Sequence, residues 1–161
     1  MSQILALSSA VLYGIADFAG GVATRSVDVW RVTAWSQLLG VPLLVVGIAI
    51  VGSTEVTTSD LVYGAIGGAL GLVGIVALYS ALAAGTMSIV SPLTGTMIAV
   101  IPVVWGLASG EQITPVQWMG ITVAIVAVVL VARDHAHARL TRTVALQALV
   151  ASFAFAGFFI V

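Results

Sequence analysis

An aspartate inside an otherwise apolar run is the residue of this chain best suited to chemistry. Asp17 lies in the stretch YGIADFAGG. Ala10, Gly14, Asp17 and Gly21 recur at steps of four, three and four, so they share one face of a helix. A carboxylate in mid-membrane costs about 2.5–3.5 kcal/mol on insertion scales, so its retention favours a role. The pattern indicates a site for a substrate cation or a proton, on a face that points into a helix bundle.

Asp17 could also have a purely structural role, in either of two ways. The residue lies about a turn and a half from the expected helix end, where its carboxylate can reach water or pair with Arg25. A protonated carboxyl group can also hydrogen-bond to a neighbouring helix without any further function. The sequence leaves both of these open beside the functional role.

Mixed stripes of small and polar residues also follow one face of the second and fourth apolar segments. Such stripes are typical of helices that line a cavity, and also of helices that pack tightly together. Pro42 and Pro102 interrupt the same two segments and are candidate hinges, because each removes a backbone donor. The stripe residues are Thr33, Gln37, Gly40, Leu44 and Gly47 in the second segment, and Ser88, Ser91, Gly95, Ala99, Pro102 and Gly106 in the fourth.

Other kinds of chemistry have little support in the sequence. The chain has no cysteine, which excludes disulfides and thiolate chemistry. His135 and His137 stand two apart in a polar connector and do not form a convincing metal site. No catalytic motif is present, and the net charge of −1 includes no basic stripe for nucleic acid. We therefore expect no enzyme activity, no metal, no cofactor and no nucleic-acid partner.

The composition of the chain indicates the kind of structure that holds these residues. The 161 residues are 61% hydrophobic and 7% charged, whereas soluble domains are about a quarter charged. Because backbone polar groups cannot stay unpaired in lipid, apolar runs of about 20 residues predict membrane-spanning helices. We expect an all-α polytopic bundle of five complete helices and a partial sixth. The predicted ranges are 3–23, 30–51, 60–84, 87–108, 114–132 and 143–161.

The chain also shows signs of a larger repeated design. Residues 1–132 form the first unit, 133–142 a charged connector, and 143–161 the start of a second unit that we expect to continue in a longer protein. Residues 10–18 align faintly with 151–159, and repeating an odd number of helices inverts the second copy, as in many secondary transporters. The third segment carries a strip of glycines for close helix contact: Gly64, Gly67, Gly68, Gly71 and Gly74.

The order of several short stretches resembles the EamA-type members of the drug/metabolite transporter superfamily. The stretches are AVLYGIADFAGG at 10–21, ALYSAL at 77–82, SIVSPL at 88–93 and PVVWG at 102–106, followed by Gly110-Glu111. The tight Gly85-Thr86 turn and the Gly-Glu pair are the most specific parts. The resemblance covers about residues 4–132.

This resemblance implies ten helices in two inverted five-helix repeats around a central cavity. It implies export or uptake of small metabolites, amino acids or drugs by alternating access, and of these two directions we expect export. By position it suggests a substrate path along Tyr13, Asp17, Tyr79, Ser91 and Thr94, and the helix stripe adds Gln37. It also matches Glu111 to the family's loop acid, which we expect to bond backbone donors at the start of the next helix, with Gly110 beside it.

The resemblance also bears on partners and orientation. Family members often carry Arg in the second helix, where this chain has Trp35-Ser36-Gln37, so an anion site gains no support. Expected partners are a small-molecule substrate, a coupling proton or cation, membrane lipid, and a missing second repeat or a second copy. We expect a multi-pass protein of the bacterial inner membrane. The five Arg residues place the first connector in the cytoplasm, whereas the family's usual description places the N-terminus there.

Two other functions stay open. A small multidrug-type exporter acting as a dimer would use Asp17 as its coupling acid, although that class normally has four helices. A non-transporting membrane scaffold would instead turn the polar stripes toward partner helices and leave no water-accessible cavity.

Overall fold

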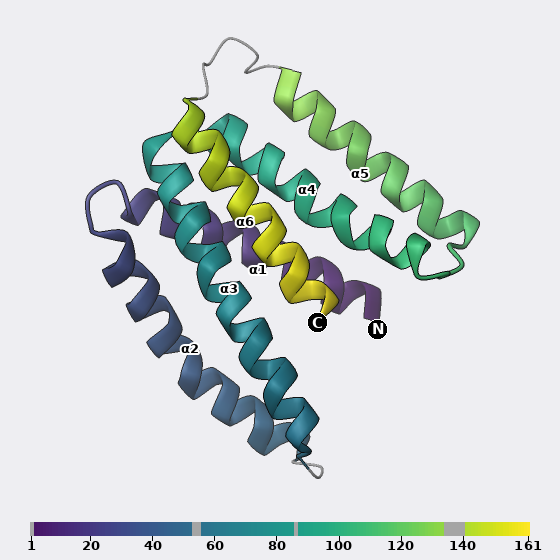
Figure 1. Ribbon diagram of the computed structural model, residues 1–161, viewed down its shortest axis with the longest axis horizontal. Helices are drawn as coiled ribbons and strands as arrows, with labels where there is room; N and C mark the ends of the chain where they lie inside the picture. Colours follow the sequence, from purple (N-terminus) through teal and green to yellow (C-terminus); the bar gives the residue numbers. More distant parts are fainter. Residues whose placement is uncertain (1, 53–55, 86, 134–140) are drawn as a thin grey trace.

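Six helices make up the part of the chain that the computed structural model describes, which is residues 2–52, 56–85, 87–133 and 141–161 (Figure 1). No strand occurs in these ranges. The predicted all-α class is confirmed, and each helix begins and ends within two residues of its predicted range. The helices are α1 (Ser2–Ala23), α2 (Val29–Val51), α3 (Thr58–Ala84), α4 (Met87–Ala108), α5 (Pro115–Arg133) and α6 (Arg142–Ile160).

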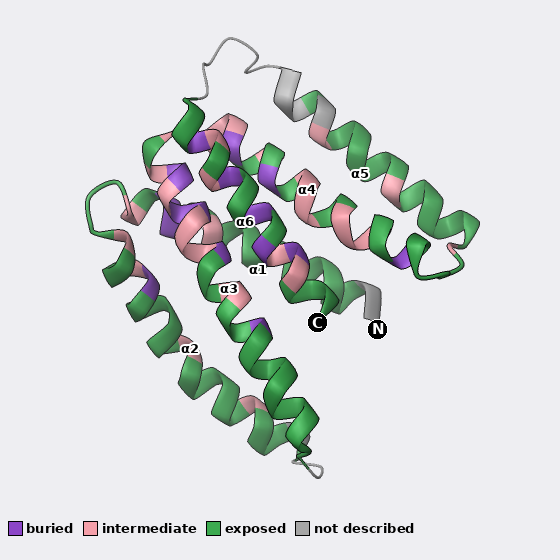
Figure 2. Cartoon of the chain, viewed as in Figure 1, coloured by how far each residue is buried: buried purple, intermediate pink, exposed green. Residues whose placement is uncertain are grey.

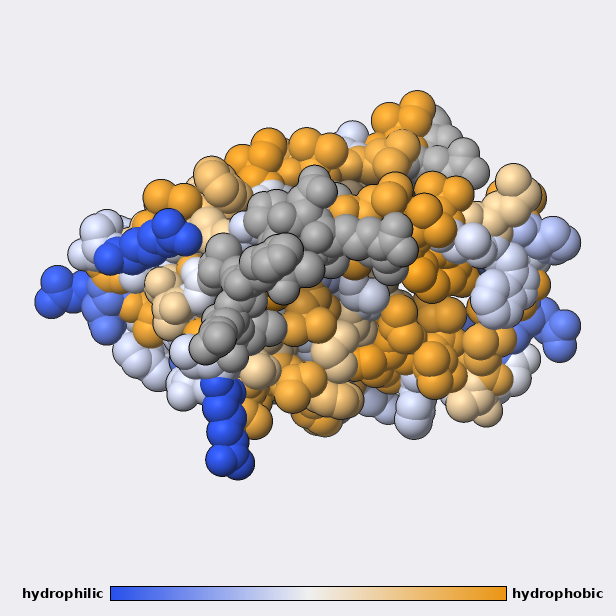
Figure 3. All heavy atoms as spheres, turned by 90° about the horizontal axis from the view of Figure 1, so that it is seen from above, coloured by the Kyte–Doolittle hydropathy of each residue, from blue (hydrophilic) through white to orange (hydrophobic). Residues whose placement is uncertain are grey.

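The helices have the length and surface of membrane spans. Five of them, α1, α2, α3, α4 and α6, are long and apolar enough to cross a bilayer, while the described apolar part of α5, Pro115–Val128, is shorter. Large apolar side chains such as Leu43 and Ile50 are 74% and 78% exposed. Figure 3 shows hydrophobic atoms over the middle of the molecule and hydrophilic atoms gathered toward its ends. This surface suits lipid, and the polytopic bundle is confirmed.

Polar residues in the connectors set where the helices begin. Asp28 caps α2 by accepting a hydrogen bond from the Trp30 amide at 3.0 Å. Thr57 and Asp60 form a capping box at α3, in which the Asp60 carboxylate accepts from the Thr57 amide at 2.9 Å. Such caps satisfy amides that have no partner inside the helix. Of the predicted charged connector, residues 134–140, which include His135 and His137, lie outside the described residues, as does Thr86.

The helices converge at one end of the bundle and spread apart toward the other. The convergent end comprises the last turns of α1 and α3 and the first turns of α2, α4 and α6. From here α3 and α4 diverge, with α6 running between them on one side (Figure 1). Buried residues gather at this end (Figure 2), whereas the opposite, splayed end is mostly exposed. The core residues are Leu78, Tyr79, Ala81, Leu82, Val90, Val144, Ala148 and Ala151.

Helix α6 is the most deeply packed of the spans. One third of its apolar window is buried, against 6–17% for the other four spans. It packs against α3 and α4 through small residues such as Ala148, Ala151 and Ser152. Since lipid gives helices little hydrophobic reason to associate, close approach through small residues is what stabilises such contacts.

Aromatic rings of α6 pack against the glycine strip of α3. A Cβ atom at Gly74 would lie 3.0 Å from the Phe155 ring, and one at Gly71 would lie 3.5 Å from the Phe158 ring. Gly67 also faces Phe158, whereas Gly64 and Gly68 have no neighbouring atom within 4 Å. Three glycines of the strip therefore contact α6, and two do not.

Candidate functional site

Polar side chains from three helices lie at similar depths in the convergent end. Asp17 is six residues before the end of α1, Tyr79 is five before the end of α3, and Ser36 is seven after the start of α2. At 1.5 Å per residue, these positions lie about 9, 8 and 10 Å from the ends of their helices. We call Asp17, Thr33, Ser36 and Tyr79 the polar layer.

Tyr79 is the centre of this layer and is only 3% exposed. Its ring lies against Gly20 of α1 so closely that a Cβ atom there would overlap the ring. The Thr24 hydroxyl donates to the carbonyl oxygens of Gly20 and Gly21 at 3.0 Å and lies 3.3 Å from the carbonyl of Tyr79. Two contacts therefore fix the crossing of α1 and α3. The Tyr79 ring packs in the space that Gly20 leaves free, and the Thr24 hydroxyl bridges the two helices.

Asp17 is half-buried beside this ring. Its carboxyl group lies within electrostatic range of the Tyr79 hydroxyl, which also lies beside Ser36 of α2. No ion pair or side-chain hydrogen bond from another described residue reaches the Asp17 carboxylate. The structure thus brings Asp17 and Tyr79 together, and the pairing of Arg25 with Asp17 that the sequence left open is not what the described residues form.

Thr33 adds a second polar group without a partner. It is 2% exposed, and its hydroxyl oxygen makes no hydrogen bond within the described part of the chain. Thr33 precedes Ser36 by three residues, so the two share a face of α2. Sequence reasoning named Thr33 only as a stripe member and missed Ser36. The signal that could have found them is the spacing of Thr33, Ser36 and Gly40 by three and then four residues.

The other predicted path residues do not join the polar layer. Tyr13 is 58% exposed, one turn farther toward the splayed end than Asp17. Gln37 and Ser91 are exposed on α2 and α4. Thr94 is buried, and its hydroxyl donates to the Val90 carbonyl of its own helix at 2.8 Å. Of the six predicted residues, therefore, only Asp17 and Tyr79 meet in the convergent end.

Glu111 does not make the contact expected of it. The start of α5 is capped by Thr114 and Gln117, whose side-chain oxygen accepts from the Thr114 amide at 2.8 Å. The Glu111 side chain instead lies against α4, where a Cβ atom at Gly106 would be 2.5 Å from a carboxylate oxygen. Gly110, at φ +88°, turns the chain back so that the Glu111 amide bonds the Gly106 carbonyl at 2.9 Å. The bond expected at the start of α5 is not among the hydrogen bonds of the described residues, because this turn directs Glu111 back toward α4.

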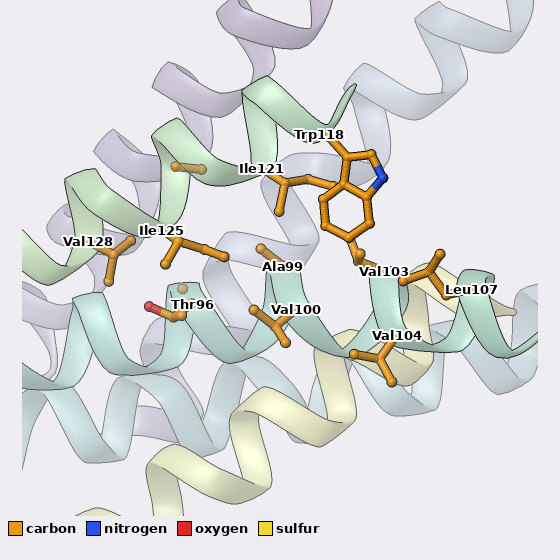
Figure 4. Close-up of a pocket in the computed structure, with 12 residues that line it drawn as sticks. Thr96, Ala99, Val100, Val103, Val104, Leu107, Trp118, Ile121, Ile125 and Val128 are labelled. Carbon is orange, nitrogen blue, oxygen red and sulfur yellow. The ribbon is translucent and has the colours of Figure 1, made fainter. Parts of the chain in front are cut away.

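An apolar cavity separates α4 from α5 and holds none of these polar residues. Its volume is about 270 Å³, and its lining includes Val100, Val103, Ile121 and Trp118 (Figure 4). The Thr96 hydroxyl at its edge donates to the Pro92 carbonyl of its own helix at 2.6 Å. Because its lining is almost entirely aliphatic and aromatic, this cavity suits hydrocarbon rather than a polar substrate.

The chemistry available in the polar layer is hydrogen bonding and charge. A carboxylate, a phenol and two aliphatic hydroxyls can accept protons or hydrogen bonds. Among the described residues, no three His, Cys, Asp or Glu side chains gather closely enough to hold a metal ion.

A comparison with protein families identifies the family of this chain. The family model for EamA-like transporters matches residues 1–133, which is most of the chain and includes α1 to α5. The chain belongs to the EamA-like transporter family. The resemblance read from the sequence is thereby confirmed, and this EamA-like protein is a multi-pass membrane protein of a transporter family. No curated protein and no solved structure matches the chain.

Proposed function

We propose that this EamA-like protein is a secondary transporter that exports a small organic molecule across the bacterial cell membrane by alternating access. The observation that carries the proposal is the contrast between the two ends of the bundle. The helices pack around a buried core that includes Tyr79 at the convergent end, and they spread apart toward the other end (Figure 2). A path that is open on one side and closed on the other is what alternating access requires of one conformation.

The proposed path runs from the splayed end down to the polar layer. Tyr13 of α1 and Gln37 of α2 line its open part, because both are exposed and lie farther from the convergent end than Asp17. Asp17 and Tyr79 form its base, with Ser91 and Thr94 of α4 as further contacts. Pro42 and Pro102 lie inside α2 and α4. We assign them the role of hinges, because each removes one backbone hydrogen bond from a helix that must change direction.

We also propose that residues 1–132 are the first of two inverted repeats and that 143–161 begin the second. The support is the packing of α6. This helix lies beyond the matched range 1–133, yet it is the most deeply buried span. A helix that fills the space between α3 and α4 behaves as part of a partner repeat that completes the bundle. A second copy of the chain is the alternative source of such a repeat.

Thiol labelling tests the transport proposal. Because the chain has no cysteine, each introduced cysteine is the only thiol in the sequence. We expect Tyr13→Cys and Gln37→Cys to react with a membrane-impermeant maleimide added to the splayed side of sealed vesicles. Ala148→Cys, which is 1% exposed in the convergent end and outside the proposed path, is the matched control and should stay protected.

The labelling pattern separates a transporter from a scaffold. Alternating access predicts that the reactivity of Tyr13→Cys changes when the vesicles are given a substrate gradient. Protection of both positions from both sides of the membrane, under every condition, would contradict the proposal and favour a scaffold whose polar stripes are covered by partner helices.

A further inference from the structure

The apolar cavity between α4 and α5 extends along half of the depth of these two helices. On α4 its lining runs from Gly95 to Leu107, one residue before the end of the helix. On α5 it runs from Trp118, the fourth residue of the helix, to Val128. These stretches are about 15 to 18 Å long, close to half of a hydrocarbon core of about 30 Å. The cavity therefore has the length of one bilayer leaflet.

We propose that this cavity holds one acyl chain of a phospholipid with an ammonium headgroup, such as phosphatidylethanolamine, and that the headgroup lies at the connector between α4 and α5. The proposal adds a fixed lipid site to the protein and does not depend on the proposed transport function. Its support is the length and lining of the cavity, an indole N–H at one end, and the charge of the connector.

The lining suits a hydrocarbon chain. Val100 of α4 lies across the cavity from Ile121 and Ile125 of α5 (Figure 4). The Thr96 hydroxyl is already bonded to the Pro92 carbonyl. An apolar cavity of about 150 Å³ is large enough to bind benzene, and this one measures about 270 Å³. Because atoms around an empty cavity lose van der Waals contacts, a chain that fills it should stabilise the pair of helices.

A lipid chain can reach the cavity from the bilayer. Val104 of α4 and Ile125 of α5 belong to the lining and are exposed, so the cavity opens to the surface. Among the described helices, α5 has extensive contact with α4 alone, and it lies at the edge of the bundle (Figure 1). The opening therefore lies where the protein meets lipid.

Trp118 provides a hydrogen-bond donor where the lipid headgroup would lie. Its ring lines the cavity, and its indole N–H lies on the side of the ring away from Ile121 (Figure 4). Tryptophan is enriched at membrane interfaces, where its N–H finds a polar partner. An ester or phosphate oxygen of a phospholipid is an acceptor at this depth, so Trp118 can bind the lipid just above its chain.

The charges at this end of the bundle favour an ammonium group over an anion. Glu111 is exposed, and its side chain lies against Gly106, next to Leu107 of the lining. The other charged residue described at this end, Asp60, is also acidic. An anionic headgroup would be repelled here, whereas an ammonium group can pair with Glu111. The described arginine side chains all lie at the convergent end: Arg25, Arg31 and Arg142.

Native mass spectrometry of the full chain with defined lipids tests the site. The probes are phosphatidylethanolamine and phosphatidylglycerol with identical acyl chains, and the wild type should retain one molecule of the first in preference to the second. Ala124→Leu fills part of the cavity and should lower this retention at least about fivefold. Ala127→Leu, exposed on the same helix and outside the lining, is the matched control and should change it less than about twofold.

The headgroup contacts are tested with the same two lipids. Glu111→Gln should weaken binding of phosphatidylethanolamine about twofold to fivefold, the effect of an exposed ion pair, and reduce the preference for it. Asp60→Asn, which removes an equal charge at the start of α3, should reduce the preference less. Trp118→Phe keeps a ring but removes the N–H, so it should weaken binding of both lipids about twofold to tenfold.

Two further measurements locate the chain and control for folding. Phosphatidylethanolamine with a diazirine in its acyl chain should, after illumination, be attached to peptides from residues 95–107 and 118–128. The unmodified lipid should raise the thermal unfolding temperature of the wild type, because a ligand of the folded state stabilises it. It should not do so for Ala124→Leu, whose own unfolding transition shows whether the variant is folded.

Four results would overturn the lipid site. They are no retained lipid in the wild type, equal or stronger retention of phosphatidylglycerol, equal retention in Ala124→Leu and Ala127→Leu, and attachment of the diazirine lipid only to other helices. A lipid-free dimer would likewise overturn it, because a second copy of the chain would then cover this face. The thiol labelling of Tyr13→Cys and Gln37→Cys concerns other helices, so the transport proposal is tested separately.

Discussion

Glycine behaves differently at the two ends of this bundle. At the convergent end, Cβ atoms at Gly20 and Gly85 would overlap or crowd Tyr79 and Val144, the latter at 2.7 Å. Toward the splayed end, Gly40 has no neighbouring atom within 4 Å. The same residue type therefore allows close contact in one region and lies in open space in the other, so glycine spacing alone does not tell which helices touch.

The difference follows from how helices associate in lipid. Apolar side chains gain little by leaving hydrocarbon for a helix interface, so shape and hydrogen bonds decide which contacts hold. The convergent end supplies both steric fit and hydrogen bonding. The Tyr79 ring packs against Gly20, and the Thr24 hydroxyl lies near the Tyr79 carbonyl of the neighbouring helix. The splayed end supplies neither and stays open.

The largest effect should come from filling the notch at Gly20. Gly20→Val places its side chain in the space of the Tyr79 ring, which is buried and cannot move away. We expect a loss of about 3 kcal/mol, the upper part of the range for overpacking. Unfolding of the reconstituted protein by denaturant measures it. Gly14→Val on the same helix, where the space is open, should lose less than about 1 kcal/mol; equal losses would refute the contrast.

A somewhat smaller effect is expected on deleting a ring from α6. Phe155→Ala removes the side chain that packs on Gly74, and it should destabilise the protein by about 2–3 kcal/mol, since the ring is half-buried. Phe153→Ala on the same helix, at a position 60% exposed, is the control and should be close to neutral. Similar unfolding midpoints for both variants would show that α6 is not held by this contact.

The hydroxyl that bridges α1 and α3 should contribute less. Thr24→Val removes the donor that lies 3.3 Å from the Tyr79 carbonyl and should cost about 0.6 kcal/mol, the average for interhelical hydrogen bonds in membranes. The control is Ser26→Ala, whose hydroxyl bonds only to Ala23 nearby in the chain. A cost above about 2 kcal/mol, measured by denaturant unfolding, would mean that Thr24 does more than bridge two helices.

The smallest effects should come from a pair of alanines on α3. Gly64→Ala enters open space and should be neutral or stabilise the helix by at most about 1 kcal/mol, because alanine favours helix over glycine. Gly74→Ala meets the Phe155 ring at 3.0 Å and should instead destabilise. A shift of the unfolding midpoint in the same direction for both variants would break the comparison between the two ends.

Most of the secondary structure could be predicted from the sequence because its causes are local. The length of the apolar runs predicted both ends of each helix to within two residues. Polar residues at the helix starts, such as Thr57 and Asp60 at α3, carry the capping groups. The short stretches around Asp17 and Tyr79 also predicted the family that the comparison confirms.

The site could be predicted only in part. A helical face marks which residues point the same way, and it singled out Asp17, the one described acid that lies more than two residues inside a helix. It did not show that Ser36 lies beside the Tyr79 hydroxyl, because that depends on how α2 crosses its neighbours. It also missed the reversal of Glu111, which depends on a left-handed turn at Gly110.

The sequence by itself determined that this chain is a set of apolar helices with one internal acid and ends fixed by polar caps. The tertiary structure decided which glycines are contacts, that α6 fills the space between α3 and α4, and which side chains share a layer with Asp17. The physical reason is that lipid drives each helix to form but is nearly indifferent to how helices meet. Their meeting depends on steric fit and hydrogen bonds between residues far apart in the chain.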